Sequence, residues 1–95
     1  MHTLQIEHAI ESYDTWKAAF DSDPLGRARE GVMSYRIYQP LDDPKYVVVD
    51  LEFEDSIDAE AFRVMLRELW KNPEQEGLIA DARARILKEV EVQQL

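Results

Sequence analysis

Hydrophobic and polar residues alternate along four stretches of the chain, and this period of two residues predicts β-strands. The stretches cover residues 3–10, 32–39, 45–53 and 86–92. The third contains consecutive valines, which favour strands because they are β-branched. One side of the first stretch carries Leu4, Ile6, His8 and Ile10.

Two other stretches repeat their apolar residues every three or four positions, which is typical of amphipathic helices. The first follows Ser12, a favourable N-cap residue, and its apolar stripe contains Tyr13, Trp16 and Phe20. The second follows the cap residues Asp55 and Ser56 and stops at Asn72-Pro73. Its apolar stripe consists of Phe62, Met65, Leu66, Leu69 and Trp70. We therefore predict one helix before and one helix after the two central strands in the order of the chain.

Two segments are less regular. Asp23 and Pro24 can serve as the cap and first residue of a short helix over residues 25–30, which Gly31 would close. Residues 74–84 are ambiguous between a short helix and a loop. The resulting order, βαββαβ, predicts a ferredoxin-like α+β sandwich with an antiparallel four-stranded sheet and both helices on one face. We expect residues 1–95 to form one domain.

Both faces of the two central strands carry large apolar or aromatic side chains. In residues 32–39, one face carries Val32, Ser34, Arg36 and Tyr38, and the other carries Met33, Tyr35 and Ile37. In residues 45–53, one face carries Val47, Val49, Leu51 and Phe53, and the other carries Tyr46, Val48, Asp50 and Glu52. Helices cover only one face, so the other needs a second cover, and a second copy of the chain is the simplest. Alternatively, the Tyr and Met side chains lie half exposed at the sheet edges.

Composition and charge exclude several classes of function. The net charge of −9 repels phosphate backbones and anionic lipids, so we expect no nucleic-acid or membrane partner. The chain has no cysteine, which excludes disulfides, thiolate nucleophiles and Cys-ligated metals. With two histidines and no glycine-rich loop, the sequence predicts no metal site and no nucleotide cofactor. No segment resembles a secretion signal, so we expect a cytoplasmic protein.

The order and spacing of these elements resemble a known group of proteins. The residues that carry the resemblance are the run 6–21, Gly31 leading into Arg36, the turn 42–44, the strand 47–53 and the run 59–62. They are similar to the dimeric α+β barrel superfamily, which includes antibiotic-biosynthesis-type monooxygenases, polyketide cyclases and stress-responsive barrels. The resemblance implies a homodimer in which two sheets pack face to face, with a pocket between sheet and helices in each subunit.

His8 and Arg36 are the candidate catalytic residues. His8 lies on the apolar side of its strand, where an imidazole with a pKa near 6.5 can be tuned for proton transfer. A buried structural histidine fits the same pattern. Arg36 lies within a strand, where its guanidinium can hold a ligand carboxylate or phenolate, although an ion pair with an acidic residue is an alternative role.

Six further residues are candidates for a substrate pocket. Trp16, Phe20 and Phe62 form the helix–sheet core and would line any cavity there, and Tyr35 and Tyr38 can add phenolic hydrogen bonds. Asp50 either approaches His8 or faces away from the helices like its neighbour Glu52, and the pattern favours the second.

The resemblance implies a small-molecule-binding barrel, such as a cofactor-free monooxygenase or cyclase acting on an apolar aromatic or polyketide-like substrate. His8 would act as the acid or base, and Arg36 or a tyrosine would stabilise an enolate or phenolate. The alternative is a non-enzymatic ligand-binding or stress-associated dimer. A pocket closed by side chains, or a His8 turned away from it, would remove the physical basis of the enzyme hypothesis.

Overall fold

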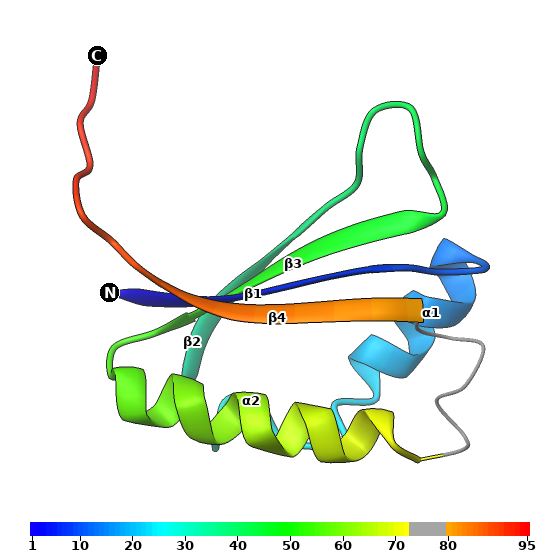
Figure 1. The fold of residues 1–95 in the computed structure, drawn as a ribbon, viewed down its shortest axis with the longest axis horizontal. Coiled ribbons are helices and arrows are strands. Elements are labelled where there is room, and N and C mark those ends of the chain that lie inside the picture. Colours follow the sequence, from blue (N-terminus) through cyan, green and yellow to red (C-terminus); the bar gives the residue numbers. More distant parts are fainter. Residues whose placement is uncertain (73–79) are drawn as a thin grey trace.

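The computed structural model describes residues 1–72 and 80–95, and it has the predicted βαββαβ order (Figure 1). The elements are β1 (His2–Ala9), α1 (Tyr13–Asp21), β2 (Val32–Tyr38), β3 (Tyr46–Phe53), α2 (Ser56–Trp70) and β4 (Ala80–Lys88). The strands form one sheet in the order β2-β3-β1-β4, and every neighbouring pair is antiparallel. This is the ferredoxin-like arrangement that the sequence predicts. Neither helix in the described part of the chain is long and apolar enough to cross a membrane.

Both helices begin at the cap residues that the sequence indicates. The Ser12 side chain accepts a hydrogen bond from the Thr15 backbone N–H at the start of α1. The Asp55 carboxylate accepts one from Ile57 N–H at the start of α2, at 2.8 Å. Each cap satisfies a backbone donor that has no partner within its helix. The helices are thus held by short-range interactions as well as by the core.

The hydrophobic core lies between the helices and one face of the sheet, here called the inner face. Its strand residues alternate regularly with outward residues, as predicted: Leu4, Ile6 and His8 in β1 and Val47, Val49, Leu51 and Phe53 in β3 are all buried. The register explains this layer, because Ile6 lies opposite Val49 and His8 opposite Val47. Residues opposite each other in antiparallel strands point to the same side of the sheet.

The opposite face of the sheet, here called the outer face, carries mostly polar cross-strand contacts. Thr3 Oγ1 donates a hydrogen bond to the Glu52 carboxylate at 2.9 Å, and Gln5 Nε2 donates one to Asp50 at 3.1 Å. Apolar and aromatic side chains lie among them, and Tyr38 and Leu87 are exposed. In Figure 1 α2 runs along the other face of the sheet. The side chains of both helices pack on that inner face.

The predicted faces of β2 need one correction. Val32 was expected on the same side as Ser34, but it lies opposite Phe53 and packs against the core. The register shifts between Val32 and Ser34, so one extra residue, Met33, is inserted there. A bulge of this kind reverses the alternation on one side of the insertion. Beyond it, Tyr35 and Ile37 face inward and Arg36 and Tyr38 face outward.

The short helix predicted for residues 25–30 is not formed. The segment is a series of turns, in which the Asp23 carboxylate accepts a hydrogen bond from the backbone N–H of Arg27 at 2.9 Å. Asp23 and Gly26 both have positive φ angles, of 50° and 70°. These left-handed conformations break the chain into turns and prevent a continuous helix.

The last strand was predicted over residues 86–92, but it covers Ala80–Lys88. Most of the preceding segment, for which the sequence was ambiguous, lies outside the described residues. The strand ends where its partner ends: His2 lies opposite Lys88, and Glu89 N–H donates to the carbonyl of Met1. No further residue of β1 remains for pairing. Val90 and Val92 are therefore exposed, in a segment that leads away from the sheet (Figure 1).

Candidate functional site

A pocket of about 360 Å³ lies between the inner face of the sheet, the two helices and the turns that follow α1. The sheet contributes Ile6, His8, Val49 and Leu51, and α2 contributes Phe62, Leu66, Leu69 and Trp70. The α1 side contributes Trp16 and Phe20, followed by Asp23, Leu25 and Arg27. The volume and the mainly apolar lining are those of a small-molecule site. The helix–sheet core is thus not closed by its own side chains.

His8 is the buried titratable group in this pocket, and its side chain is 2% exposed. Its Nδ1 lies 3.1 Å from the backbone carbonyl oxygen of Ala9. A carbonyl only accepts hydrogen bonds, so Nδ1 carries the proton, and in the neutral ring Nε2 is then the atom with the free lone pair. Within the described residues no group forms a hydrogen bond with Nε2. The ring is thus arranged as a proton acceptor.

The surroundings of His8 favour its neutral form. Burial lowers the pKa of the imidazole from its ordinary value of 6.5, and the hydrogen bond to Ala9 opposes this shift. The cause is desolvation, because a charged imidazolium loses the stabilisation of water inside an apolar pocket. At neutral pH the ring is therefore uncharged, and its Nε2 can accept a proton.

An aromatic wall extends from His8 along α1. The His8 and Trp16 rings meet edge to face, with centroids 6.1 Å apart, and Trp16 stacks on Phe20 at 5.2 Å. Residues 16 and 20 are one turn apart, so a helix presents both on the same side. The helical periodicity of the sequence predicted both Trp16 and Phe20 as residues of this pocket. This wall can pack against a flat apolar ligand.

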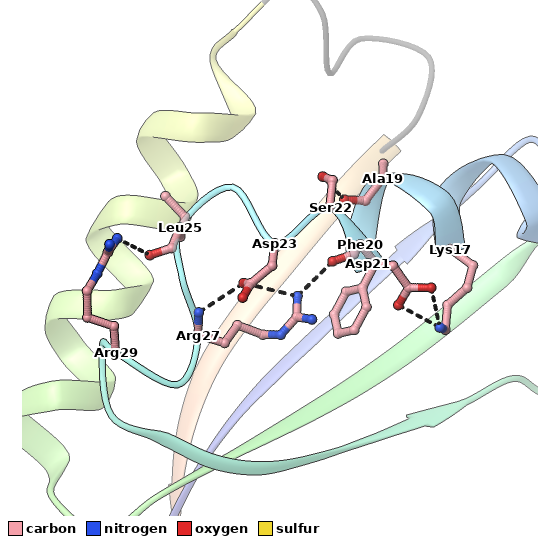
Figure 2. A network of polar contacts seen from close by, with 9 residues as sticks. All are labelled: Lys17, Ala19, Phe20, Asp21, Ser22, Asp23, Leu25, Arg27 and Arg29. Carbon is pink, nitrogen blue, oxygen red and sulfur yellow. Dashed lines mark hydrogen bonds and ion pairs between the residues drawn. The ribbon is translucent and has the colours of Figure 1, made fainter.

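Arg27 lies at the other end of this wall, and sequence reasoning did not identify it. Its guanidinium carbon lies 3.9 Å from the centroid of the Phe20 ring and 5.2 Å from that of Tyr35. Its Nη1 donates a hydrogen bond to the Phe20 carbonyl at 2.8 Å and lies 3.6 Å from the Asp23 carboxylate (Figure 2). The sequence placed Arg27 in a short helix over residues 25–30, and nothing in that pattern indicated a site.

The structure brings together four of the predicted residues: His8, Trp16, Phe20 and Phe62 all line the pocket. Tyr35 faces the same side of the sheet, and its ring meets that of Phe20 edge to face with centroids 5.1 Å apart. It does not itself line the pocket. Trp70, which was predicted in the same helix–sheet core, lines the pocket as well.

Three predicted site residues lie on the outer face. Arg36 lies opposite Asp50 and Tyr38 opposite Val48, whereas His8 belongs to the inner face. Of the two orientations considered for Asp50, the outward one is therefore found, and an approach to His8 is ruled out by the pleat. The sequence could not place Arg36 relative to His8 because it does not reveal the bulge in β2.

The described part of the chain contains no group of three or more His, Asp or Glu side chains that could hold a metal ion. The polar side chains that line the pocket are His8, Ser22, Asp23, Arg27 and Asn72. These groups suit hydrogen bonding and proton transfer to an organic ligand.

Comparison with solved structures identifies several similar folds at low sequence identity. Rv0793 from Mycobacterium tuberculosis is 16% identical, with a TM-score of 0.69 and 98% of each chain covered. A dimeric ferredoxin-like protein from an uncultured marine organism is 16% identical, with a TM-score of 0.63 and coverage of 99% of this chain and 97% of that one. A protein named antibiotic biosynthesis monooxygenase is 13% identical, with a TM-score of 0.64 and coverage of 96% and 100%.

These similarities establish the ferredoxin-like fold and connect it with structures of monooxygenase-like proteins. No protein-family model matches the chain, and no curated protein matches its sequence. Because folds host many functions, the function has to be argued from the pocket itself.

Proposed function

We propose that this protein binds a small, largely apolar ring compound in the pocket and acts on it as a cofactor-free monooxygenase or cyclase. The observation that carries the proposal is the buried His8 in the pocket, whose Nε2 is left free by the hydrogen bond from Nδ1 to the Ala9 carbonyl. A base beside an aromatic wall suits the removal of a proton from a bound ring ketone or phenol.

In the oxygenation, Nε2 of His8 accepts a proton from a substrate CH₂ group next to a carbonyl or phenol. The resulting anion transfers one electron to O₂, and the two radicals combine to a peroxide anion, which takes the proton back from His8 and becomes a hydroperoxide. Loss of water then converts CH₂ into C=O, so that one O₂ yields one ketone oxygen and one water. The protein supplies the base, the orientation and a pocket with little water. In a cyclisation, the same anion attacks a carbonyl of the same substrate.

One observation favours non-enzymatic ligand binding as the second candidate. The partner of His8 Nδ1 is a carbonyl rather than a carboxylate. An imidazolium formed at His8 therefore has no negative charge at Nδ1 to stabilise it, whereas many catalytic histidines have one. In this second function the pocket binds the same class of ligand without turnover.

We also propose that two copies of the chain pair through their outer faces. Tyr38 is 47% exposed there, opposite the half-buried Val48, and Leu87 is 39% exposed on β4, at the other edge of the same face. On this face Glu52 and Asp50 accept hydrogen bonds from Thr3 and Gln5, so contact with a second copy would bury carboxylates that already have hydrogen-bond partners. The similarity to a dimeric ferredoxin-like protein supports the pairing.

The enzymatic proposal is tested by measuring oxygen uptake and product mass with a panel of fused-ring phenols and ring ketones. For a substrate that is turned over, His8→Gln should lower the rate about 100-fold or more, the usual contribution of a general base. His2→Gln is the matched control, because His2 is the other histidine of the same strand and does not line the pocket. Binding without turnover across the panel would favour the second candidate, and full turnover by His8→Gln would exclude the proposed base.

A further inference from the structure

We propose that the ligand of this pocket carries a carboxylate on its ring system, and that Arg27 is the residue that recognises it. This inference rests on the proposed function, because it specifies the ligand of the same pocket. Among the described residues that line the pocket, Arg27 is the only one with a permanent positive charge. Its side chain is 16% exposed, so its charge is largely removed from water.

The guanidinium of Arg27 is held in a fixed position with donors to spare. It lies against the Phe20 ring, and the hydrogen bond from Nη1 to the Phe20 carbonyl fixes its rotation (Figure 2). No group in the described part of the chain accepts a hydrogen bond from Nε or Nη2. These two nitrogens form one side of the guanidinium fork, whose geometry matches the two oxygens of a carboxylate.

The nearby Asp23 leaves this side of the guanidinium available. Its Oδ1 lies 3.6 Å from Nη1, which is longer than a hydrogen bond, and the same oxygen accepts the backbone N–H of Arg27 at 2.9 Å. Asp23 therefore contributes mainly to the turn that positions Arg27. Its negative charge reduces the attraction of the guanidinium for a ligand carboxylate, but Asp23 forms no hydrogen bond with Nε or Nη2.

The order of contacts along the aromatic wall specifies the shape of the ligand. The wall runs from His8 through Trp16 and Phe20 to Arg27. A flat ring system that packs along it would meet a proton acceptor near one end and a fixed cation near the other. Such a ligand is an aromatic acid with its reactive group distant from the carboxylate.

The charge of the protein makes this preference measurable. With a net charge of −9, the chain as a whole repels an anionic ligand and attracts a cationic one. An acidic protein without a local cation would therefore bind the neutral or the cationic member of a ligand series best. A preference for the anion has to come from a side chain in the pocket.

The experiment compares three probes of the same shape: 2-naphthoate, 2-naphthylmethanol and 2-naphthylmethylamine. Binding is followed by the indole N–H signals in ¹⁵N NMR spectra, because the chain has two tryptophans and both line the pocket. We expect wild-type protein to bind the acid about 10-fold more tightly than the alcohol, the usual contribution of a buried charged hydrogen bond. Arg27→Gln should remove this difference and leave binding of the alcohol unchanged, and Arg27→Lys should restore part of it.

Arg29→Gln is the matched control, because Arg29 belongs to the same turns but its side chain is 76% exposed and does not line the pocket. It should bind all three probes like the wild type. Equal affinity of wild-type protein for the acid and the alcohol would overturn the assignment of Arg27 and leave the proposed function intact. Failure of all three probes to shift the indole signals would overturn both. The comparison of the acid with the alcohol in the wild type needs no variant, so it tests the preference for a carboxylate even if Arg27→Gln does not fold.

Discussion

At the scale of single residues, the chemistry of the pocket depends on the protonation of His8. A histidine on the apolar side of a strand is visible in the sequence, because it interrupts the series Leu4, Ile6 and Ile10. Its tautomer is not visible, because it depends on where the Ala9 carbonyl points. Arg27 was missed for a related reason: its position over Phe20 depends on turns that replace the helix predicted there.

The lowered pKa of His8 makes the stability of the protein depend on pH. In the unfolded chain the imidazole has its ordinary pKa of 6.5, whereas burial lowers that value in the folded protein. As the pH falls below 6.5, the unfolded state binds more protons, so the free energy of unfolding decreases until the folded pKa is passed. Above 6.5 both states hold the neutral ring, and the contribution of His8 is constant.

Urea unfolding at pH 7.5 and pH 5.5 measures this effect. We expect the wild type to lose more stability between these pH values than His8→Gln does. Because the carboxylates titrate in both proteins, the difference between the two losses isolates the histidine. Equal losses would contradict the lowered pKa of His8.

At the scale of elements, the sequence predicts most of the secondary structure because period and caps agree. Ser12 and Asp55 begin their helices as expected, and β3 keeps its alternation of inward and outward residues throughout. In the last strand the hydrophobic period and the residue preferences disagree. Residues 82–85 alternate Ala and Arg, which puts small side chains inward, but both residue types favour helices and so obscure the strand. The valines beyond Lys88 continue the alternation of a strand, but no residue of β1 remains there to pair with them.

Gly31 determines how the turns after α1 lead into β2. Its φ is +102°, and a Cβ there would lie 3.0 Å from Oδ2 and 3.3 Å from Cβ of Asp58 on α2. We expect Gly31→Ala to lower the free energy of unfolding by about 1–3 kcal/mol, through backbone strain and this contact. Gly26→Ala is the matched comparison: its φ is +70°, and its new Cβ would meet the guanidinium of Arg29, which is flexible and exposed.

Chemical denaturation of both variants tests the difference. Gly26→Ala should cost less, because the end of the Arg29 side chain can move aside, whereas Asp58 belongs to a helix. If Gly26→Ala were the more destabilising change, the contact of Gly31 with α2 would not limit this position.

At the scale of the whole molecule, the predicted βαββαβ topology is confirmed, and the pocket lies between its sheet and helices. The sequence predicts the topology better than the details of the site, because each helix and strand has its own hydrophobic pattern. Short connections between successive elements then limit how the strands can be arranged. The outer face was identified in outline as a second partly apolar surface. The pattern separates Tyr35 and Ile37 from Arg36 and Tyr38 correctly, but it places Val32 on the wrong face because it does not reveal the bulge in β2.

Pairing through the outer face is tested by sedimentation. We expect the wild type to sediment as a dimer of 22.2 kDa, which is twice the chain mass of 11.1 kDa. Val48→Asp should shift the equilibrium toward the monomer, because it places a charge in the middle of the outer face. Val64→Asp is the control, because Val64 is exposed on α2, away from that face. A monomeric wild type, or equal effects of the two variants, would contradict this interface.

The most direct test of the proposed site is the state of the His8 ring in the presence of a bound ring compound. Imidazole ¹⁵N signals distinguish the protonated nitrogen from the free one, and 2-naphthol offers a hydroxyl proton on a flat ring system. We predict that His8 is neutral at pH 7 with its proton on Nδ1, and that 2-naphthol shifts the Nε2 signal to saturation while the His2 signals stay in place. A protonated His8, or an Nε2 signal that does not respond at saturating ligand, would contradict the proposed base.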